Sequence, residues 1–132
     1  MVSTTPVIML VDDDPDFLEM NRRVLEAKGC KVVCFSDSQA AFEQMGRERP
    51  HLVIADLMIK SLDSGFSFSR TIKEDPRLKG IPVVIVTAIT RRLGLDFNPA
   101  TPAELAAMHA DAYFDKPVNP QTLWAKVEEL LN

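Results

Sequence analysis

Short apolar runs that end abruptly on a polar side chain are the feature of this sequence that most restricts its fold. The clearest run spans residues 51–56, follows Pro50 and stops on the carboxylate of Asp56. A run this short and apolar is typical of a strand buried on both faces of a sheet. In an open parallel sheet, ligands bind at the carboxyl ends of the strands. The pattern therefore predicts that Asp56 lies at a functional edge.

Other apolar runs end in the same way. They are residues 7–11 before Asp12, Asp13 and Asp14, residues 83–86 before Thr87, and residues 113–114 before Asp115 and Lys116. If these strands are parallel, one edge of one sheet gathers several carboxylates, a hydroxyl and an ammonium. Such an edge is the outline of a site for a cation and a phosphoryl group.

Length and charge exclude several classes of function. The 132 residues fit a single domain, 1–132, with no room for a second core, so we expect no output domain. The composition, 46% hydrophobic and 26% charged, argues against disorder. A net charge of −4 argues against nucleic-acid binding. No apolar run approaches the roughly 18 residues of a membrane span, so we expect a cytoplasmic protein without membrane contact.

The order of elements predicts the fold class. Helical segments are expected between the strands, over residues 14–29, 36–46, 65–74, 101–110 and 119–131. Asp14 with Pro15 is typical of a helix start, and Ser36 with Gln39 is a capping-box pattern. Five strands alternating with five helices predict a doubly wound α/β domain, with a five-stranded parallel sheet and helices on both faces. Cys30 and Cys34 are expected as reduced thiols, because their spacing fits no redox or zinc motif.

The chemistry of the predicted edge is that of phosphoryl transfer. Each group alone has a structural explanation, since acids favour helix N-termini and a lysine is most often a surface charge. Together, converging carboxylates repel one another, and Mg²⁺ relieves that repulsion while sharing its ligand shell with phosphate. Lys116 and Thr87 could then hold phosphoryl oxygens, and Asp56 would be the nucleophile that forms an aspartyl phosphate.

Taken in chain order, these motifs resemble the receiver domains of two-component response regulators. The matching pieces span nearly the whole chain and are residues 11–14, Asp56, residues 86–88 and residues 113–117. The resemblance implies a flavodoxin-like sheet with the strand order 2-1-3-4-5. It also implies that phosphorylation switches the domain and that signalling proceeds through protein contacts.

The resemblance assigns a role to each residue of the edge. Asp56 is similar to the phosphoacceptor, and Asp13, Asp56 and the backbone carbonyl of Met58 are similar to the ligands of Mg²⁺, with Asp12 acting through water. Lys116 resembles the phosphate-binding lysine, which precedes a peptide to Pro117 that is often cis. Two further residues resemble the switch pair, Thr87 as the hydroxyl and Tyr113 as the aromatic.

The resemblance also implies partners. The phosphoryl group would come from a sensor histidine kinase or a histidine phosphotransfer protein. Output would pass through a face built from the fourth helix, the fifth strand and the fifth helix, toward a downstream protein or a second copy of the chain. The chain would be no enzyme beyond catalysing its own phosphotransfer and dephosphorylation.

Two rival functions are open. A receiver-like module that works without phosphorylation usually lacks one of the site residues, yet Asp56, the acidic pair and Lys116 are all present. An aspartyl-phosphate phosphohydrolase needs a general acid two residues after the nucleophile, where this chain has Met58.

The sequence departs from the family pattern at a few positions. Lys60 stands where a proline is usual, Gly65 comes one residue late, and the segment between Thr87 and Lys116 is several residues longer than usual. Two apolar residues, Met58 and Ile89, occupy the positions expected to tune dephosphorylation. Because neither side chain can orient a water, they predict a long-lived phosphorylated state.

Overall fold

The computed structural model describes residues 5–56, 64–88 and 110–131. One sheet contains all the described strands: β1 (Val7–Val11), β2 (Lys31–Phe35), β3 (Leu52–Ala55), β4 (Val83–Thr87) and β5 (Ala112–Asp115). Every pair of neighbouring strands is parallel, and the order is β2-β1-β3-β4-β5. The predicted fold class and strand order are therefore confirmed.

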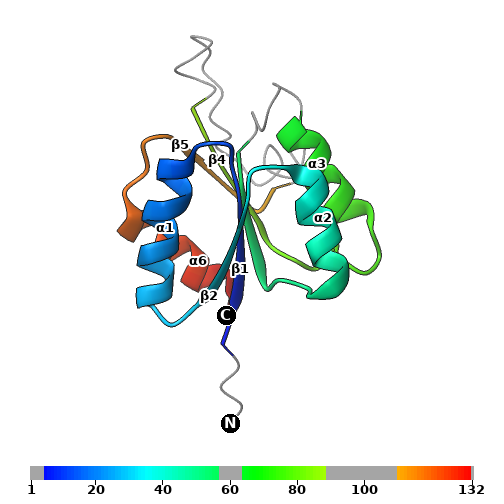
Figure 1. Ribbon diagram of the computed structural model, residues 1–132, viewed down its shortest axis with the longest axis horizontal. Coiled ribbons are helices and arrows are strands. Elements are labelled where there is room, and N and C mark those ends of the chain that lie inside the picture. Colours follow the sequence, from blue (N-terminus) through cyan, green and yellow to red (C-terminus); the bar gives the residue numbers. More distant parts are fainter. Residues whose placement is uncertain (1–4, 57–63, 89–109, 132) are drawn as a thin grey trace.

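Helices cover both faces of the sheet, as predicted. The described helices are α1 (Pro15–Ala27), α2 (Ser38–Arg47), α3 (Ser64–Glu74) and α6 (Pro120–Leu131). In Figure 1, α1 and α6 lie on one face, and α2 and α3 lie on the other. The helix predicted over residues 101–110 lies outside the described residues except for its last position, Ala110, which is not helical. None of the helices in the described ranges is long and apolar enough to cross a membrane.

Successive residues of a strand contribute to two separate hydrophobic cores, one on each face of the sheet. Met9 and Val11 of β1 pack toward α2 and α3, whereas Ile8 and Leu10 pack toward α1 and α6. All five residues of β1 are buried, because helices cover both faces of this central strand. Its apolar run without polar alternation therefore has a direct structural cause.

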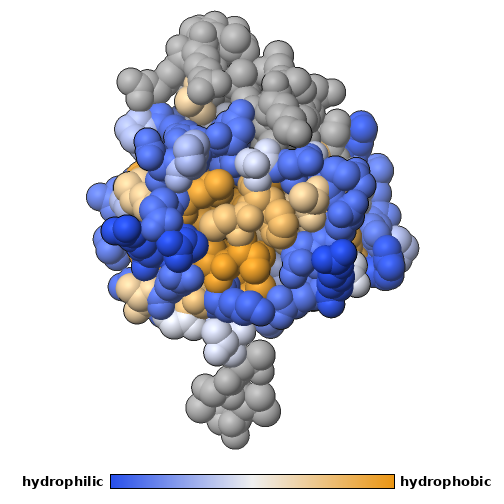
Figure 2. All heavy atoms as spheres, viewed as in Figure 1, coloured by the Kyte–Doolittle hydropathy of each residue, from blue (hydrophilic) through white to orange (hydrophobic). Residues whose placement is uncertain are grey.

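The edge strand β2 is less buried than β1. Four of its residues, Val32, Val33, Cys34 and Phe35, are half-buried and pack against one core or the other. Figure 2 shows hydrophobic residues exposed between the hydrophilic surfaces of α1 and α2, where β2 lies. Cys34 and the buried Cys30 are both free thiols, as predicted, and burial raises the pKa of each.

The helix ends agree with the sequence in two cases and correct it in one. Asp14 caps α1 by accepting a hydrogen bond from the Asp16 N–H at 3.0 Å, and Asn119 accepts one from Gln121 N–H at 2.8 Å at the start of α6. The predicted capping box between Ser36 and Gln39 is wrong.

Asp37 caps α2 in place of Ser36. Its carboxylate accepts a hydrogen bond from the Gln39 N–H at 3.0 Å, and the helix begins at Ser38. An ionised oxygen next to the first turn is favoured by both the unpaired N–H groups and the helix dipole. The serine one residue earlier is therefore left outside the cap.

Candidate functional site

The parallel register gathers the predicted polar residues at the carboxyl edge of the sheet. β1 and β3 are paired so that Asp12 and Asp56 each follow their strand at equivalent positions. Thr87 ends β4 beside Asp115 at the end of β5, and Lys116 follows directly. This juxtaposition is the one that the sequence predicted from strand ends alone.

Three carboxylates converge at this edge. Asp12 and Asp56 are buried, with 0% and 6% exposure, and Asp13 is exposed to solvent. Each residue can offer one oxygen within 4.8 Å of those of the other two. Hard oxygen donors of like charge at this spacing fit a divalent cation such as Mg²⁺, which tolerates few protein ligands and keeps an open, hydrated side. The cluster can therefore hold a metal ion.

Lys116 links two of these acids. Its Nζ lies 2.7 Å from Asp12 Oδ2 and 3.2 Å from Asp56 Oδ2, and its side chain is only 16% exposed. Burial lowers the pKa of Lys116, but the hydrogen bond to Asp12 and the charges of both acids outweigh this effect and raise it overall. The side chain is therefore an ammonium at neutral pH.

Asp12 is the most constrained acid of the cluster. Its Oδ1 accepts a hydrogen bond from the Asp14 backbone N–H at 2.9 Å, while its Oδ2 accepts from Lys116. Burial raises the pKa of Asp12 to about 6, although the hydrogen bonds from Lys116 and the Asp14 N–H oppose the rise. A bound cation would add positive charge beside this buried carboxylate to that of Lys116.

The two predicted switch residues lie on neighbouring strands. Thr87 is fully buried and Tyr113 is half-buried against the core below α2 and α3. The Tyr113 hydroxyl donates a hydrogen bond to Asp115 Oδ1 at 3.1 Å. Burial and the charge of Asp115 raise the pKa of Tyr113 far above its ordinary value, so the side chain is a neutral phenol.

One residue near the site was missed by the sequence-based prediction. Met58, Ile89 and Lys60 lie outside the described residues. The peptide between Lys116 and Pro117 is cis, in agreement with the resemblance. Phe17, which the strand-end pattern does not place near the site, has its ring beneath the Lys116 ammonium. Its place in the first turn after the acidic triplet is the signal that could have identified it.

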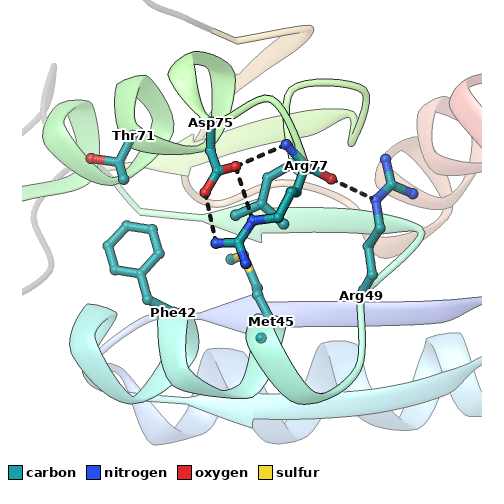
Figure 3. A pocket seen from close by; sticks show the side chains of 8 residues that line it. Phe42, Met45, Arg49, Thr71, Asp75 and Arg77 are labelled. Atoms are coloured by element: carbon teal, nitrogen blue, oxygen red, sulfur yellow. Dashed lines mark hydrogen bonds and ion pairs between the residues drawn. The ribbon is translucent and has the colours of Figure 1, made fainter.

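A hollow lies away from this edge, between α2 on one side and the end of α3 with the turn before β4 on the other (Figure 3). It encloses about 320 Å³, and its lining includes Phe42, Met45, Arg49, Asp75 and Arg77. Asp75 accepts a hydrogen bond from the Arg77 backbone N–H at 2.8 Å and pairs with its guanidinium at 3.3 Å. Arg49 Nε donates to the Arg77 carbonyl at 3.1 Å. Because these polar groups pair with one another and stabilise the turn, we place the candidate chemistry at the acidic cluster and not in this hollow.

Known proteins share this sequence pattern. The response regulator receiver domain family matches residues 8–128. The DNA-binding response regulator MtrA of Mycolicibacterium smegmatis is 33% identical over 128 residues, which are 94% of this chain and 50% of that protein. An uncharacterized 14.6 kDa protein of Leptolyngbya boryana is 30% identical over 122 residues, which are 92% of this chain and 87% of that protein. The chain thus spans about half the length of MtrA.

The fold is shared as well. The crystal structure of a putative response regulator from Chloroflexus aurantiacus matches this chain with a TM-score of 0.81 at 24% identity, covering 97% of this chain and 98% of that one. At that identity the likeness concerns the fold alone. The family match over residues 8–128 and the ordered carboxylates at the sheet edge agree with it. The chain belongs to the response regulator receiver domain family of two-component systems.

Proposed function

We propose that this chain is a phosphorylatable receiver whose Asp56 accepts a phosphoryl group from a phosphohistidine. The donor would be a sensor histidine kinase or a histidine phosphotransfer protein. The observation that carries the proposal is the position of Lys116, whose ammonium is hydrogen-bonded to both Asp12 and Asp56 beside the acidic cluster. A nucleophilic carboxylate, a cation site and a fixed ammonium are the groups that transfer to an aspartate needs.

Each residue of the site has a separate role in the proposed phosphoryl transfer. An Asp56 oxygen attacks phosphorus, so that an O–P bond forms as the N–P bond to the donor histidine breaks. Lys116 offers its ammonium to a phosphoryl oxygen. Asp13, Asp56 and the backbone carbonyl of Met58 would hold Mg²⁺, with Asp12 reaching it through water. The metal would supply positive charge that lets the anionic phosphoryl group approach this cluster.

Labelling with a phosphorylated kinase or phosphotransfer protein tests this assignment. The wild type should gain one acid-labile phosphate in the presence of Mg²⁺ and none with excess EDTA. Asp56→Asn should abolish labelling, whereas Asp16→Asn, which removes an exposed carboxylate outside the metal cluster, should leave it intact. Undiminished labelling of Asp56→Asn would show that another residue is the acceptor.

Two other outcomes would favour the rival functions. A wild type that stays unlabelled while binding its partner would favour the phosphorylation-independent module. Continuous release of phosphate from small phosphate esters would favour the phosphohydrolase. Our proposal is a signalling module that transfers and loses only its own phosphoryl group.

The output of the switch is proposed to be a protein contact in the cytoplasm, with neither nucleic acid nor membrane involved. Thr87 would move toward the phosphoryl group, and Tyr113 would turn inward. The surface concerned contains β5 and α6 together with the segment of residues 89–109, where the fourth helix is predicted. Its partner would be a downstream protein or a second copy of the chain. Because such coupling is a population shift, the active form should exist at low level without phosphate.

A further inference from the structure

The Lys116 ammonium has an aromatic neighbour in addition to its two acids. Its Nζ lies over the ring of Phe17, 4.4 Å from the ring centroid. A cation within about 6 Å of a ring centroid is attracted by the negative face of the ring. An ammonium has three N–H donors, and Asp12 and Asp56 account for two of the contacts. The ring is therefore a further partner of the same cation.

The ring is held in a fixed position. Phe17 is 8% exposed and belongs to the core below α1 and α6. Its carbonyl accepts a hydrogen bond at 2.9 Å from the amide of Asn21, which is itself buried. Since the Asp14 N–H that leads into α1 bonds to Asp12 Oδ1, the helix carrying the ring and the lysine are both attached to one carboxylate.

We infer that Phe17 is a positioning residue for Lys116, an inference that rests on the proposed phosphorylation of Asp56. A lysine side chain is long and flexible, so its ammonium must be restrained to meet a phosphoryl oxygen at one place. The ring face restrains the ammonium without taking a proton or adding negative charge. When a phosphoryl oxygen displaces Lys116 from a carboxylate, the ring keeps the ammonium beside Asp56.

Fluorinated phenylalanines separate this role from ordinary core packing. Replacing Phe17 by phenylalanine with one, two and three ring fluorines weakens the ring face stepwise while changing its volume little. Labelling of Asp56 by phosphoramidate in Mg²⁺ should slow with each fluorine, by about tenfold in all. Phe17→Leu should be at least as slow as the trifluorinated form.

Two controls show whether substitution of Phe17 changes the labelling rate through the Lys116 ammonium. The same series at Phe114, which packs against the same core, should leave the labelling rate unchanged. In a Lys116→Met background, the Phe17 series should have no effect on the residual rate, because the ring acts through the ammonium. A Phe17 series that slows this background equally would assign the effect to packing and overturn the inference.

A readout other than activity keeps the two proposals apart. In ¹³C-resolved NMR spectra, the ring current of Phe17 should shift the Lys116 Hε protons, and Phe17→Leu should remove that shift. Labelling of the wild type at the same rate as every Phe17 variant would overturn the inference alone. An unlabelled wild type with an intact ring-current shift would overturn the proposed function, and with it the role of the contact in phosphorylation. Absence of the shift in the wild type would overturn the contact itself.

Discussion

At the scale of single residues, Asp12 joins the start of α1 to Lys116. It is fully buried, yet it is ionisable and lies near a second carboxylate, Asp56. Natural sites often retain such groups at a cost in stability because function needs them. The raised pKa of Asp12 makes that cost measurable without a metal.

The stability of the metal-free protein should fall as pH rises through 6. Burial raises the pKa of Asp12 from 3.8 to about 6, so the folded state binds the proton more tightly than the unfolded state. The resulting stabilisation is complete below about pH 4 and is lost above the folded pKa. The shift corresponds to a change of about 3 kcal/mol in the free energy of unfolding.

Urea unfolding in EDTA between pH 4 and 8 measures this change. The free energy of unfolding of the wild type minus that of Asp12→Asn should decrease as pH rises, since asparagine does not titrate. A difference that stays constant over this range would contradict the role assigned to the buried carboxylate. Magnesium affinity of the wild type should fall below pH 6, where protons compete for the cluster.

The lifetime of the phosphorylated state is a second prediction at this scale. Hydrolysis needs a water in line with the bond to Asp56, and the resemblance to receiver domains implies that this water passes Met58 and Ile89. Both side chains are apolar, so neither can orient the water by hydrogen bonding. The double substitution Met58→Asn with Ile89→Glu should shorten the lifetime without abolishing labelling. Decay followed after removal of the donor in excess Mg²⁺ measures it, and an unchanged decay rate would show that these side chains do not set the lifetime.

The sequence predicted the polar groups of the site better than their surroundings. Asp12, Asp56, Thr87 and Lys116 could be predicted because each closes or follows a strand, and parallel strands end at one edge. Phe17 was missed, since an apolar residue at helical spacing is ordinarily core. Its contact with Lys116 joins residues from opposite ends of the chain and depends on the packing of α1.

At the scale of elements, the end of a helix can be predicted from the sequence where a single residue determines it. Asp14 with Pro15 predicted the start of α1, and Gly29, with a φ of 92°, follows the helix in a conformation that other residues rarely adopt. The start of α2 was mispredicted because Ser36 and Asp37 are adjacent and both side chains can cap. Periodicity cannot choose between them, but the hydrogen bond from the Gln39 N–H does.

Substitution of the two candidate caps tests the corrected start of α2. Asp37→Ala should lower the free energy of unfolding by about 1 kcal/mol, because a first-turn N–H loses its acceptor. Ser36→Ala, at an exposed position before the cap, should change it by roughly 0.5 kcal/mol or less. Urea unfolding curves at one pH measure both. The reverse order of effects would restore Ser36 as the cap.

At the scale of the whole molecule, the site exists only because the sheet is complete. Its groups lie at the carboxyl ends of β1, β3, β4 and β5, and parallel pairing holds these strands in register. Alternating apolar runs and helical stripes predicted this arrangement. No such pattern organises residues 89–101, so the surface proposed for output could not be derived beyond β5 and α6.

Loading the site should therefore stabilise the whole domain. Mg²⁺ with beryllofluoride, which mimics a phosphoryl group on an aspartate, binds the folded state only. At a ligand concentration of 100 times Kd, this adds about 2.7 kcal/mol and raises the unfolding midpoint by roughly 10 °C. Asp56→Asn should show no beryllofluoride-dependent rise, whereas Asp16→Asn should behave as the wild type.

The same ligand should change how the domain assembles, because it favours the conformation that meets a partner. If the partner is a second copy, sedimentation velocity should show concentration-dependent dimers with Mg²⁺ and beryllofluoride, and monomers with Asp56→Asn. A loaded domain that stays monomeric would exclude self-association and direct the search to a different protein.

Replacing residues 89–101 by a segment of usual family length should then weaken binding of that protein. Unchanged binding would show that this segment does not determine the partner.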